Sequence, residues 1–287
     1  MLNSVGLQPI IFKNPIKINH LLPCRLLFSH GTDKESAMKV PIPPAIAPLL
    51  RRDLNPEWLA AEQGILRYLA PEQLAGDNGK YMKLYNRLAA LYDLGERLAD
   101  CFVYRRSIAA MRREMMALPE WRNGAAVLYV SVGTGRDFAF IPPQIDTGSL
   151  NIVGADLSLG MLRRADKLWR HKLPFTPLHC AAEDLPFADN SFDIVFHVGG
   201  INFFSNKQRA LAEMLRVAKP GTLLMVADET QDLIDRQYRR NPLTRSAFDG
   251  ARFDLSDIES LIPAAALERQ THLLWDGRFY ALTFRKA

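Results

Sequence analysis

The sequence has few cysteines and no long apolar run. None of its apolar runs approaches the about 20 residues that a helix needs to span a bilayer, so we expect no membrane-spanning segment. Its three cysteines, Cys24, Cys101 and Cys180, are an odd number and widely separated, which excludes a disulfide framework or a CxxC metal pair. This usage indicates a reducing compartment. With 287 residues, 48% of them hydrophobic, the chain can bury one α/β core with an appended segment.

The first 32 residues contain no acidic side chain, although they carry Lys13, Lys17 and Arg25. An acid-free basic stretch is typical of an organelle import sequence, so we predict that it directs the chain to mitochondria, at the inner membrane. The alternative is an upstream extension with translation starting at Met38, which leaves the chain cytoplasmic. A proline-rich stretch closes the segment, and we expect residues 1–45 to form a disordered extension.

The net charge of +5 favours anionic surfaces. No run of Lys and Arg is interleaved with aromatic residues, so nucleic acid is not an expected partner. Anionic lipid head groups fit this charge, and the alternative is a basic enzyme without an anionic partner. We therefore expect a peripheral contact with a membrane surface.

Apolar residues at helical spacing dominate residues 46–118, where Asn55 is expected to cap a helix that runs through Leu69. This region is predicted to form an N-terminal helical cap. From residue 119 the pattern changes to short β-rich runs that alternate with helical stretches. The runs lie at 126–132, 150–156, 173–180, 192–198 and 222–228. The alternation predicts βαβ units and a parallel sheet with helices on both faces.

The end of the chain, residues 271–284, reads as two strands around Asp276-Gly277, which is a strong hairpin signal. Parallel strands followed by an antiparallel hairpin distinguish the methyltransferase sheet from ordinary Rossmann sheets. We therefore predict a three-layer α/β sandwich of the class I methyltransferase type over residues 119–287, with a mostly parallel seven-stranded sheet.

Candidate ligand-binding residues stand where strands end, which is where open α/β sheets bind ligands. Gly133-Thr134-Gly135 follows the first strand, and its missing Cβ atoms let the backbone approach a ligand closely. A dinucleotide fingerprint needs a third glycine where Phe138 stands, which disfavours NAD. Asp156 ends the next strand, where a carboxylate can accept both ribose hydroxyls of an adenosyl ligand. Its alternative role is a helix N-cap.

Residues 79–286 resemble the class I methyltransferases of the ubiquinone/menaquinone type. The matching motifs are KYMKLYNRLAALYDL, CAAEDLPFADNSFDIVFHVGG and RVAKPGTLLMVADET. The resemblance implies S-adenosylmethionine as cofactor, a loop after the third strand at the adenine, and a tyrosine-bearing lid helix. The candidate cofactor-binding residues are Gly133, Thr134, Gly135, Asp156, Leu157, Ala182, Glu183, Val198 and Tyr85 of the lid.

The chain departs from this family at Tyr129, where members carry Asp or Glu near the cofactor's ammonium group, and at Ala181, where members carry Asp.

The strings VLYVSVGTG, DLSLGMLRR and FHVGGINFFS resemble the rhodoquinone-biosynthesis group. That resemblance implies conversion of ubiquinone to rhodoquinone, in which an amino group from S-adenosylmethionine replaces a ring methoxy group with the help of Mn or Mg. A carboxylate beside an amine raises its pKa, so Tyr129 in its place favours the neutral, nucleophilic amine. Sequence drift is the alternative.

Three other residues are candidates for chemistry. His197 ends the fourth strand and is a candidate proton shuttle, or else a pocket-wall residue. Asp228 and Glu229 end the fifth strand and are candidate ligands of a divalent metal, or else helix caps. The expected substrate is a ubiquinone-like lipid. The alternatives are a conventional quinone or phenol methyltransferase and a noncatalytic methyltransferase-like assembly factor of a respiratory complex.

Overall fold

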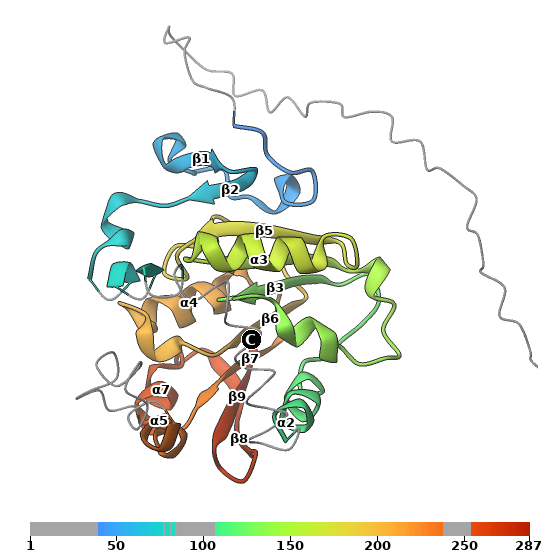
Figure 1. The fold of residues 1–287 in the computed structure, drawn as a ribbon, viewed down its shortest axis with the longest axis vertical. Coiled ribbons are helices and arrows are strands. Elements are labelled where there is room, and N and C mark those ends of the chain that lie inside the picture. The colour runs from blue at the N-terminus through green and yellow to red at the C-terminus, as the bar shows by residue number, and fades with distance from the viewer. Residues whose placement is uncertain (1–39, 77, 81, 84–85, 87–106, 238–253) are drawn as a thin grey trace, which may run out of the picture. The chain divides into compact units, whose positions relative to one another are not determined.

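The computed structural model describes residues 40–76, 78–80, 82–83, 86, 107–237 and 254–287 (Figure 1). Tyr85 and most of the predicted extension lie outside these residues. Residues 40–45, which the sequence predicted to be disordered, instead lead onto the folded part. Val40 packs against the hydrophobic core, and the Ala45 carbonyl accepts a 3.1 Å hydrogen bond from Asn151 Nδ2.

One sheet of nine strands runs through the described part of the chain. Its spatial order is β1-β2-β5-β4-β3-β6-β7-β9-β8, with β2 to β7 parallel to one another and β1, β9 and β8 joined by antiparallel pairing. The strands are β1 Leu59–Glu62, β2 Ile65–Tyr68, β3 Ala126–Val130, β4 Asn151–Asp156, β5 Phe175–Cys180, β6 Ile194–Val198, β7 Leu223–Glu229, β8 Ala266–Leu274 and β9 Phe279–Lys286. The predicted parallel strands and the terminal hairpin are confirmed.

Helices cover both faces of the sheet. Buried residues of α2 and α3 belong to one hydrophobic cluster, and those of α4 and α7 belong to the other. The helices are α2 Ser107–Met116, α3 Leu159–Trp169, α4 Lys207–Val217, α5 Gln231–Gln237 and α7 Leu255–Leu261, and the short 3-10 helices are η1 Ala47–Leu49, η2 Pro56–Trp58, η3 Pro71–Leu74, η5 Arg136–Phe140, η6 Thr147–Ser149 and η7 Ile201–Phe203. None of the described helices is long and apolar enough to cross a membrane.

The predicted helix from Asn55 through Leu69 is wrong. The Asn55 side chain caps only the short η2 by accepting a 3.0 Å bond from Glu57 N, and β1 and β2 form a hairpin behind it. The turn of this hairpin is Gln63-Gly64, with φ of 54° and 82°, and glycine adopts such values without steric cost. The hairpin adds two strands beside β5, so the predicted sheet of seven strands is extended to nine.

Candidate active site

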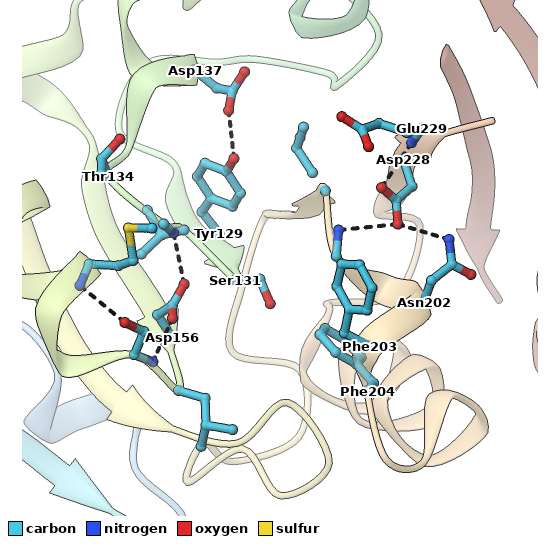
Figure 2. A pocket seen from close by; sticks show the side chains of 18 of the residues that line it. Tyr129, Ser131, Thr134, Asp137, Asp156, Asn202, Phe203, Phe204, Asp228 and Glu229 are labelled. Atoms are coloured by element: carbon cyan, nitrogen blue, oxygen red, sulfur yellow. Dashed lines mark hydrogen bonds between the residues drawn. The ribbon is translucent and has the colours of Figure 1, made fainter. Parts of the chain in front are cut away.

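A cavity lies at the carboxyl ends of β3, β4, β6 and β7. This is the edge at which parallel sheets bind ligands, because the connecting loops can surround a molecule there. The lining residues come from these strand ends and from the segments that follow them, as Figure 2 shows, and also from α2, from β9, and from Asn78 and Met82. The cavity therefore joins residues that are far apart in the sequence.

The wall after β3 is a tight backbone turn. Gly133 has a φ of +55°, and a Cβ atom at this position would meet no atom within 4 Å. The backbone there thus faces open space that a ligand can occupy. Gly135 differs, since its Cβ would lie 2.8 Å from Phe138 Cε2 and 3.0 Å from Trp169 Cδ1, and it is not among the lining residues. The predicted ligand role of Gly135 is replaced by a packing role.

Asp156, the last residue of β4, joins this turn to the neighbouring strand. One carboxylate oxygen accepts a 2.8 Å bond from Gly133 N, and the other accepts a 2.7 Å bond from Ser158 N. Burial raises the pKa of Asp156 to about 6. The N-cap of α3 is Ser158, whose hydroxyl accepts from Met161 N at 3.2 Å, so the alternative capping role for Asp156 does not hold.

Each oxygen of the Asp156 carboxylate therefore accepts one short backbone bond and retains a second lone-pair direction. Two adjacent hydroxyl groups of a ligand could each donate a hydrogen bond to one of these two carboxylate oxygens. A ribose presents such a pair, and the open backbone at Gly133 lies next to it. The residues on this wall thus fit the adenosyl part of S-adenosylmethionine.

Tyr129 carries a second polar group into the cavity. Its ring is buried between Phe138 and Phe196, and its hydroxyl donates a 2.6 Å bond to Asp137 Oδ2. The other oxygen of Asp137 is paired with Arg112 of α2. A carboxylate is therefore present at this wall, although β3 itself does not supply one. The expectation that Tyr129 removes the carboxylate from the site is wrong, because Asp137 brings one back from η5.

Asp228, at the end of β7, lies on the opposite wall (Figure 2). Its carboxylate accepts bonds from Gly200 N at 3.1 Å, Asn202 Nδ2 at 3.3 Å and Glu229 N at 2.8 Å. Burial raises its pKa to about 6. A carboxylate that accepts these three N–H bonds stabilises the turn around it. Within the described ranges no three His, Cys, Asp or Glu side chains come together as a group that could hold a metal ion. Asp228 and Glu229 line the cavity but do not fit the predicted metal.

His197 is not brought into the cavity. Successive side chains of a strand point to opposite faces, and because Val198 lines the cavity His197 points into the core. The imidazole is fully buried, packs edge-on against Phe204, and has no hydrogen-bond partner among the described residues. This burial lowers its pKa to about 3, so the ring stays neutral and is not placed for the predicted proton transfer.

The structure brings most of the predicted site residues together. Ala182 and Glu183 lie outside the lining, and Glu183 instead accepts a 3.2 Å bond from Asn78, which does line it. Tyr85 lies outside the described residues. The predicted residues that line the cavity are Tyr129, Gly133, Thr134, Asp156, Leu157, Val198, Asp228 and Glu229.

Sequence reasoning missed Arg112, Asp137 and Asn202. Asp137 could have been predicted, because it stands four positions after Gly133 and therefore in the first turn that follows the glycine loop. Arg112 carried none, since its place depends on how α2 packs against η5. Asn202 follows the pair Gly199-Gly200, whose φ values of 76° and 92° mark a tight turn after β6.

Comparison with known proteins agrees with this geometry. A methyltransferase domain family matches residues 128–226. The demethylmenaquinone methyltransferase of Renibacterium salmoninarum is 45% identical over 105 residues, which are 37% of this chain and 41% of the relative. The ubiquinone/menaquinone biosynthesis C-methyltransferase UbiE of Burkholderia mallei is 36% identical over 151 residues, which are 52% of this chain and 60% of the relative. The matches thus span about half the length of these relatives.

Solved structures share the fold. A chain in the complex between the Haloferax volcanii Trm112 methyltransferase activator and a methyltransferase gives a TM-score of 0.55 at 16% identity, covering 71% of this chain and 98% of that one. An S-adenosylmethionine-dependent methyltransferase from Thermotoga maritima gives 0.51 at 23% identity, covering 71% and 99%. The chain therefore has the class I methyltransferase fold, and its residues 128–226 match a methyltransferase domain family.

Proposed function

We propose that this chain is an S-adenosylmethionine-dependent transferase that modifies a ring carbon of a ubiquinone-like quinone. The observation that carries the cofactor assignment is the Asp156 carboxylate, with one acceptor direction on each oxygen beside the open backbone of Gly133. The quinone assignment is supported by the names of the two relatives, of which one mentions demethylmenaquinone and the other ubiquinone/menaquinone biosynthesis.

The transferred group in this proposal is the amino group, so that a ring methoxy of ubiquinone is exchanged and rhodoquinone is formed. The supporting observation is Tyr129, which stands at the strand end without a charge of its own. Asp137 lies beside it, but its charge is balanced by Arg112. A carboxylate raises the pKa of a nearby amine, and a neighbouring cation offsets this effect. Because Arg112 is paired with Asp137, an amine at this wall should have a lower pKa than it would have beside an unpaired carboxylate.

The exchange makes and breaks defined bonds. A carbon–nitrogen bond forms at the methoxy-bearing ring carbon, the carbon–oxygen bond to the methoxy group breaks, and methanol leaves with the proton that the nitrogen gives up. S-Adenosylmethionine would supply the nitrogen, and the bond from this nitrogen to the α-carbon would break by elimination: a proton leaves the β-carbon and passes to the nitrogen, and a double bond forms between the α- and β-carbons. S-Adenosylhomocysteine is therefore not the product. The apolar rings of Phe203, Phe204 and Phe279 line the cavity and keep water from the reacting carbon.

The test supplies ubiquinone with S-adenosylmethionine that carries ¹⁵N at the α-amino group and ²H in the methyl group. Amino transfer predicts a quinone with ¹⁵N and without ²H, together with released methanol. The Asp156→Ala variant, which removes the ribose acceptor, is the control and should give neither label. A quinone without ¹⁵N in the wild-type reaction would refute amino transfer.

Conventional methyl transfer is the second candidate, because the two relatives are named a demethylmenaquinone methyltransferase and a ubiquinone/menaquinone biosynthesis C-methyltransferase. It needs a demethylated quinone or phenol supplied beside ubiquinone, because the methyl group must replace a hydrogen on the acceptor. With that acceptor it predicts the opposite labels: ²H in the product, no ¹⁵N, and one S-adenosylhomocysteine for each product molecule. The same experiment therefore separates the two reactions, and a chain that labels no quinone but binds a respiratory subunit would instead be an assembly factor.

The proposed place of action is a membrane surface, at the mitochondrial inner membrane if the first 32 residues act as an import sequence. The proposal is supported by the net charge of +5 and by the isoprenoid nature of the substrate class. Sedimentation with vesicles that contain cardiolipin should recover more chain than sedimentation with neutral vesicles, and the difference should vanish in 0.5 M salt. Equal recovery would contradict it.

A further inference from the structure

His179, near the end of β5, is a buried polar residue that lies outside the cavity lining. It is 4% exposed, and its Nε2 lies 3.0 Å from the Leu157 carbonyl oxygen. A carbonyl oxygen only accepts hydrogen bonds, so Nε2 carries a proton and donates this bond. Leu157 directly follows Asp156 and lines the cavity. His179 therefore holds the segment after β4 from the neighbouring strand.

The register of the sheet explains why the imidazole reaches this segment. β4 and β5 run parallel with Asp156 opposite His179, so both side chains point to the same face of the sheet. On the other side of β5, the hairpin of β1 and β2 pairs with it and sets Arg67 opposite His179 (Figure 1). Glu62 of the same hairpin places Oε2 3.6 Å from Nδ1. The two added strands thus bury the ring.

One peptide unit joins His179 to the Asp156 carboxylate. The Leu157 carbonyl accepts the bond from His179, and the N–H of the same unit, on Ser158, donates a 2.7 Å bond to Asp156 Oδ1. A peptide unit is planar and trans, so its C=O and N–H point in opposite directions. Because His179 fixes the carbonyl, it also fixes the N–H that holds the carboxylate.

A packing role for this imidazole is the alternative. Burial lowers the pKa of His179, and its Nδ1 has no hydrogen-bond partner among the described residues. Burying a polar ring with one nitrogen unpaired costs free energy, which an apolar side chain in the same place would not cost. What an apolar side chain could not supply is the N–H that meets the Leu157 carbonyl. The imidazole is therefore explained by this bond better than by packing.

We propose that His179 is a positioning residue for ribose recognition, which holds the Leu157–Ser158 peptide so that the Asp156 carboxylate faces both ribose hydroxyls. The inference rests on the proposed cofactor and deepens it. His179 itself does not touch the ligand and acts only through this peptide. Its loss should therefore weaken the recognition of the sugar hydroxyls in particular.

The test compares calorimetric affinities for 5′-methylthioadenosine, which carries the base and the ribose, and for its 2′-deoxy form, which lacks one hydroxyl. The wild-type chain should prefer the ribose form by about tenfold, because the deoxy form loses one charge-assisted bond to Asp156. His179→Leu removes the donor. It should weaken the ribose form by about fivefold and reduce the preference to about threefold or less.

His179→Gln tests rescue by a conservative change. Its amide nitrogen is a donor that stands the same number of bonds from the backbone as Nε2, so it can meet the Leu157 carbonyl. This variant should keep the preference for the ribose form within about twofold of the wild-type value. A preference lost equally in His179→Gln and His179→Leu would contradict the proposal, since only the first variant retains the donor.

The matched control is His272→Leu. His272 also bonds through Nε2 to a group on the neighbouring strand, the Thr283 hydroxyl at 3.0 Å, but it stands on the edge strand β8 outside the cavity lining. This variant should lower the melting temperature and leave the preference for the ribose form unaltered. The preference is thus a readout that a merely structural role would not move.

The outcomes separate this inference from the proposed function. A preference that stays at the wild-type value in His179→Leu would overturn the positioning role and leave the cofactor in place. A wild-type chain that binds neither ligand would overturn the proposed function, and this inference with it. If His179→Leu does not fold, as judged by circular dichroism, His179→Asn replaces it, because its shorter amide ends one bond short of the Leu157 carbonyl.

Discussion

Asp156 and Asp228 share their position at a strand end and a raised pKa, but they differ in their hydrogen bonds and in their surroundings. Both end a parallel strand, both line the cavity, and burial raises the pKa of both to about 6. Asp156 accepts one short bond on each oxygen and adjoins the open backbone of Gly133. Asp228 receives two bonds on a single oxygen, from Gly200 and Asn202, and thereby holds a turn.

From this difference we expect that a raised pKa and a place in the cavity are not enough to identify the carboxylate that binds a ligand. What separates these two residues is the direction of their unused acceptor sites and the space in front of them. We therefore expect Asp156 to meet the cofactor and Asp228 to shape the opposite wall.

Loss of the Asp156 carboxylate should have the largest effect. Asp156→Ala removes two charge-assisted bonds to the ribose and should weaken S-adenosylmethionine binding by about 100-fold, or roughly 3 kcal/mol. Asp228→Asn should change the affinity less than about threefold, since it keeps the size of the side chain on the other wall. Calorimetry on both variants checks the contrast, and equal losses would abolish it.

The pH dependence of binding should follow Asp156. The ribose hydroxyls need the ionised carboxylate, and the raised pKa means that a proton competes with the ligand below about pH 6. The affinity should be constant above pH 7 and about tenfold weaker at pH 5. Asp228→Asn should retain this profile and Asp156→Asn should flatten it. A profile that flattens in Asp228→Asn instead would reverse the two assignments.

The two glycines of the turn should respond differently to the same substitution. Gly133→Ala places a Cβ at a positive φ and in the ligand space, so it should lower the affinity several-fold and cost about 1 kcal/mol of stability. Gly135→Ala pushes against Phe138 and should lower the free energy of unfolding by about 1–3 kcal/mol with little effect on affinity. Thermal melts and calorimetry separate these outcomes, and an affinity loss confined to Gly135→Ala would contradict them.

His197 should give the smallest effect. Because its ring is neutral and has no hydrogen-bond partner among the described residues, His197→Leu replaces an unsatisfied polar group by an apolar one. The free energy of unfolding should stay level or rise by about 1 kcal/mol, and cofactor affinity should not change. Denaturant unfolding measures the first quantity. A tenfold loss of affinity would instead place His197 against the ligand.

The sequence predicted those site residues that stand directly at the carboxyl end of a strand. Gly133 and Asp156 were identified because the alternation of strands and helices places the carboxyl ends of parallel strands at one edge. The terminal hairpin was predicted from the turn signal Asp276-Gly277 between two apolar runs. These features depend on residues that are near one another in the chain.

The features that were missed depend on packing between distant segments. Arg112 meets Asp137 across 25 residues, and no local pattern relates them. The hairpin of β1 and β2 replaces the predicted helix: its apolar residues also fit a helical spacing, whereas Gly64, with a φ of 82°, forms a turn that a helix cannot contain. His197 was placed in the site by its nearness to the strand end, although the strand alternation directs its side chain to the core.

The central claim is that the wall formed by Gly133 and Asp156 binds an adenosyl ligand. The most direct measurement is a calorimetric titration of the wild-type chain with S-adenosylmethionine, repeated with 5′-methylthioadenosine already present. We expect saturation at one site for each chain and a loss of heat in the presence of the competitor. A titration without heat, or one that the competitor leaves unchanged, would contradict it.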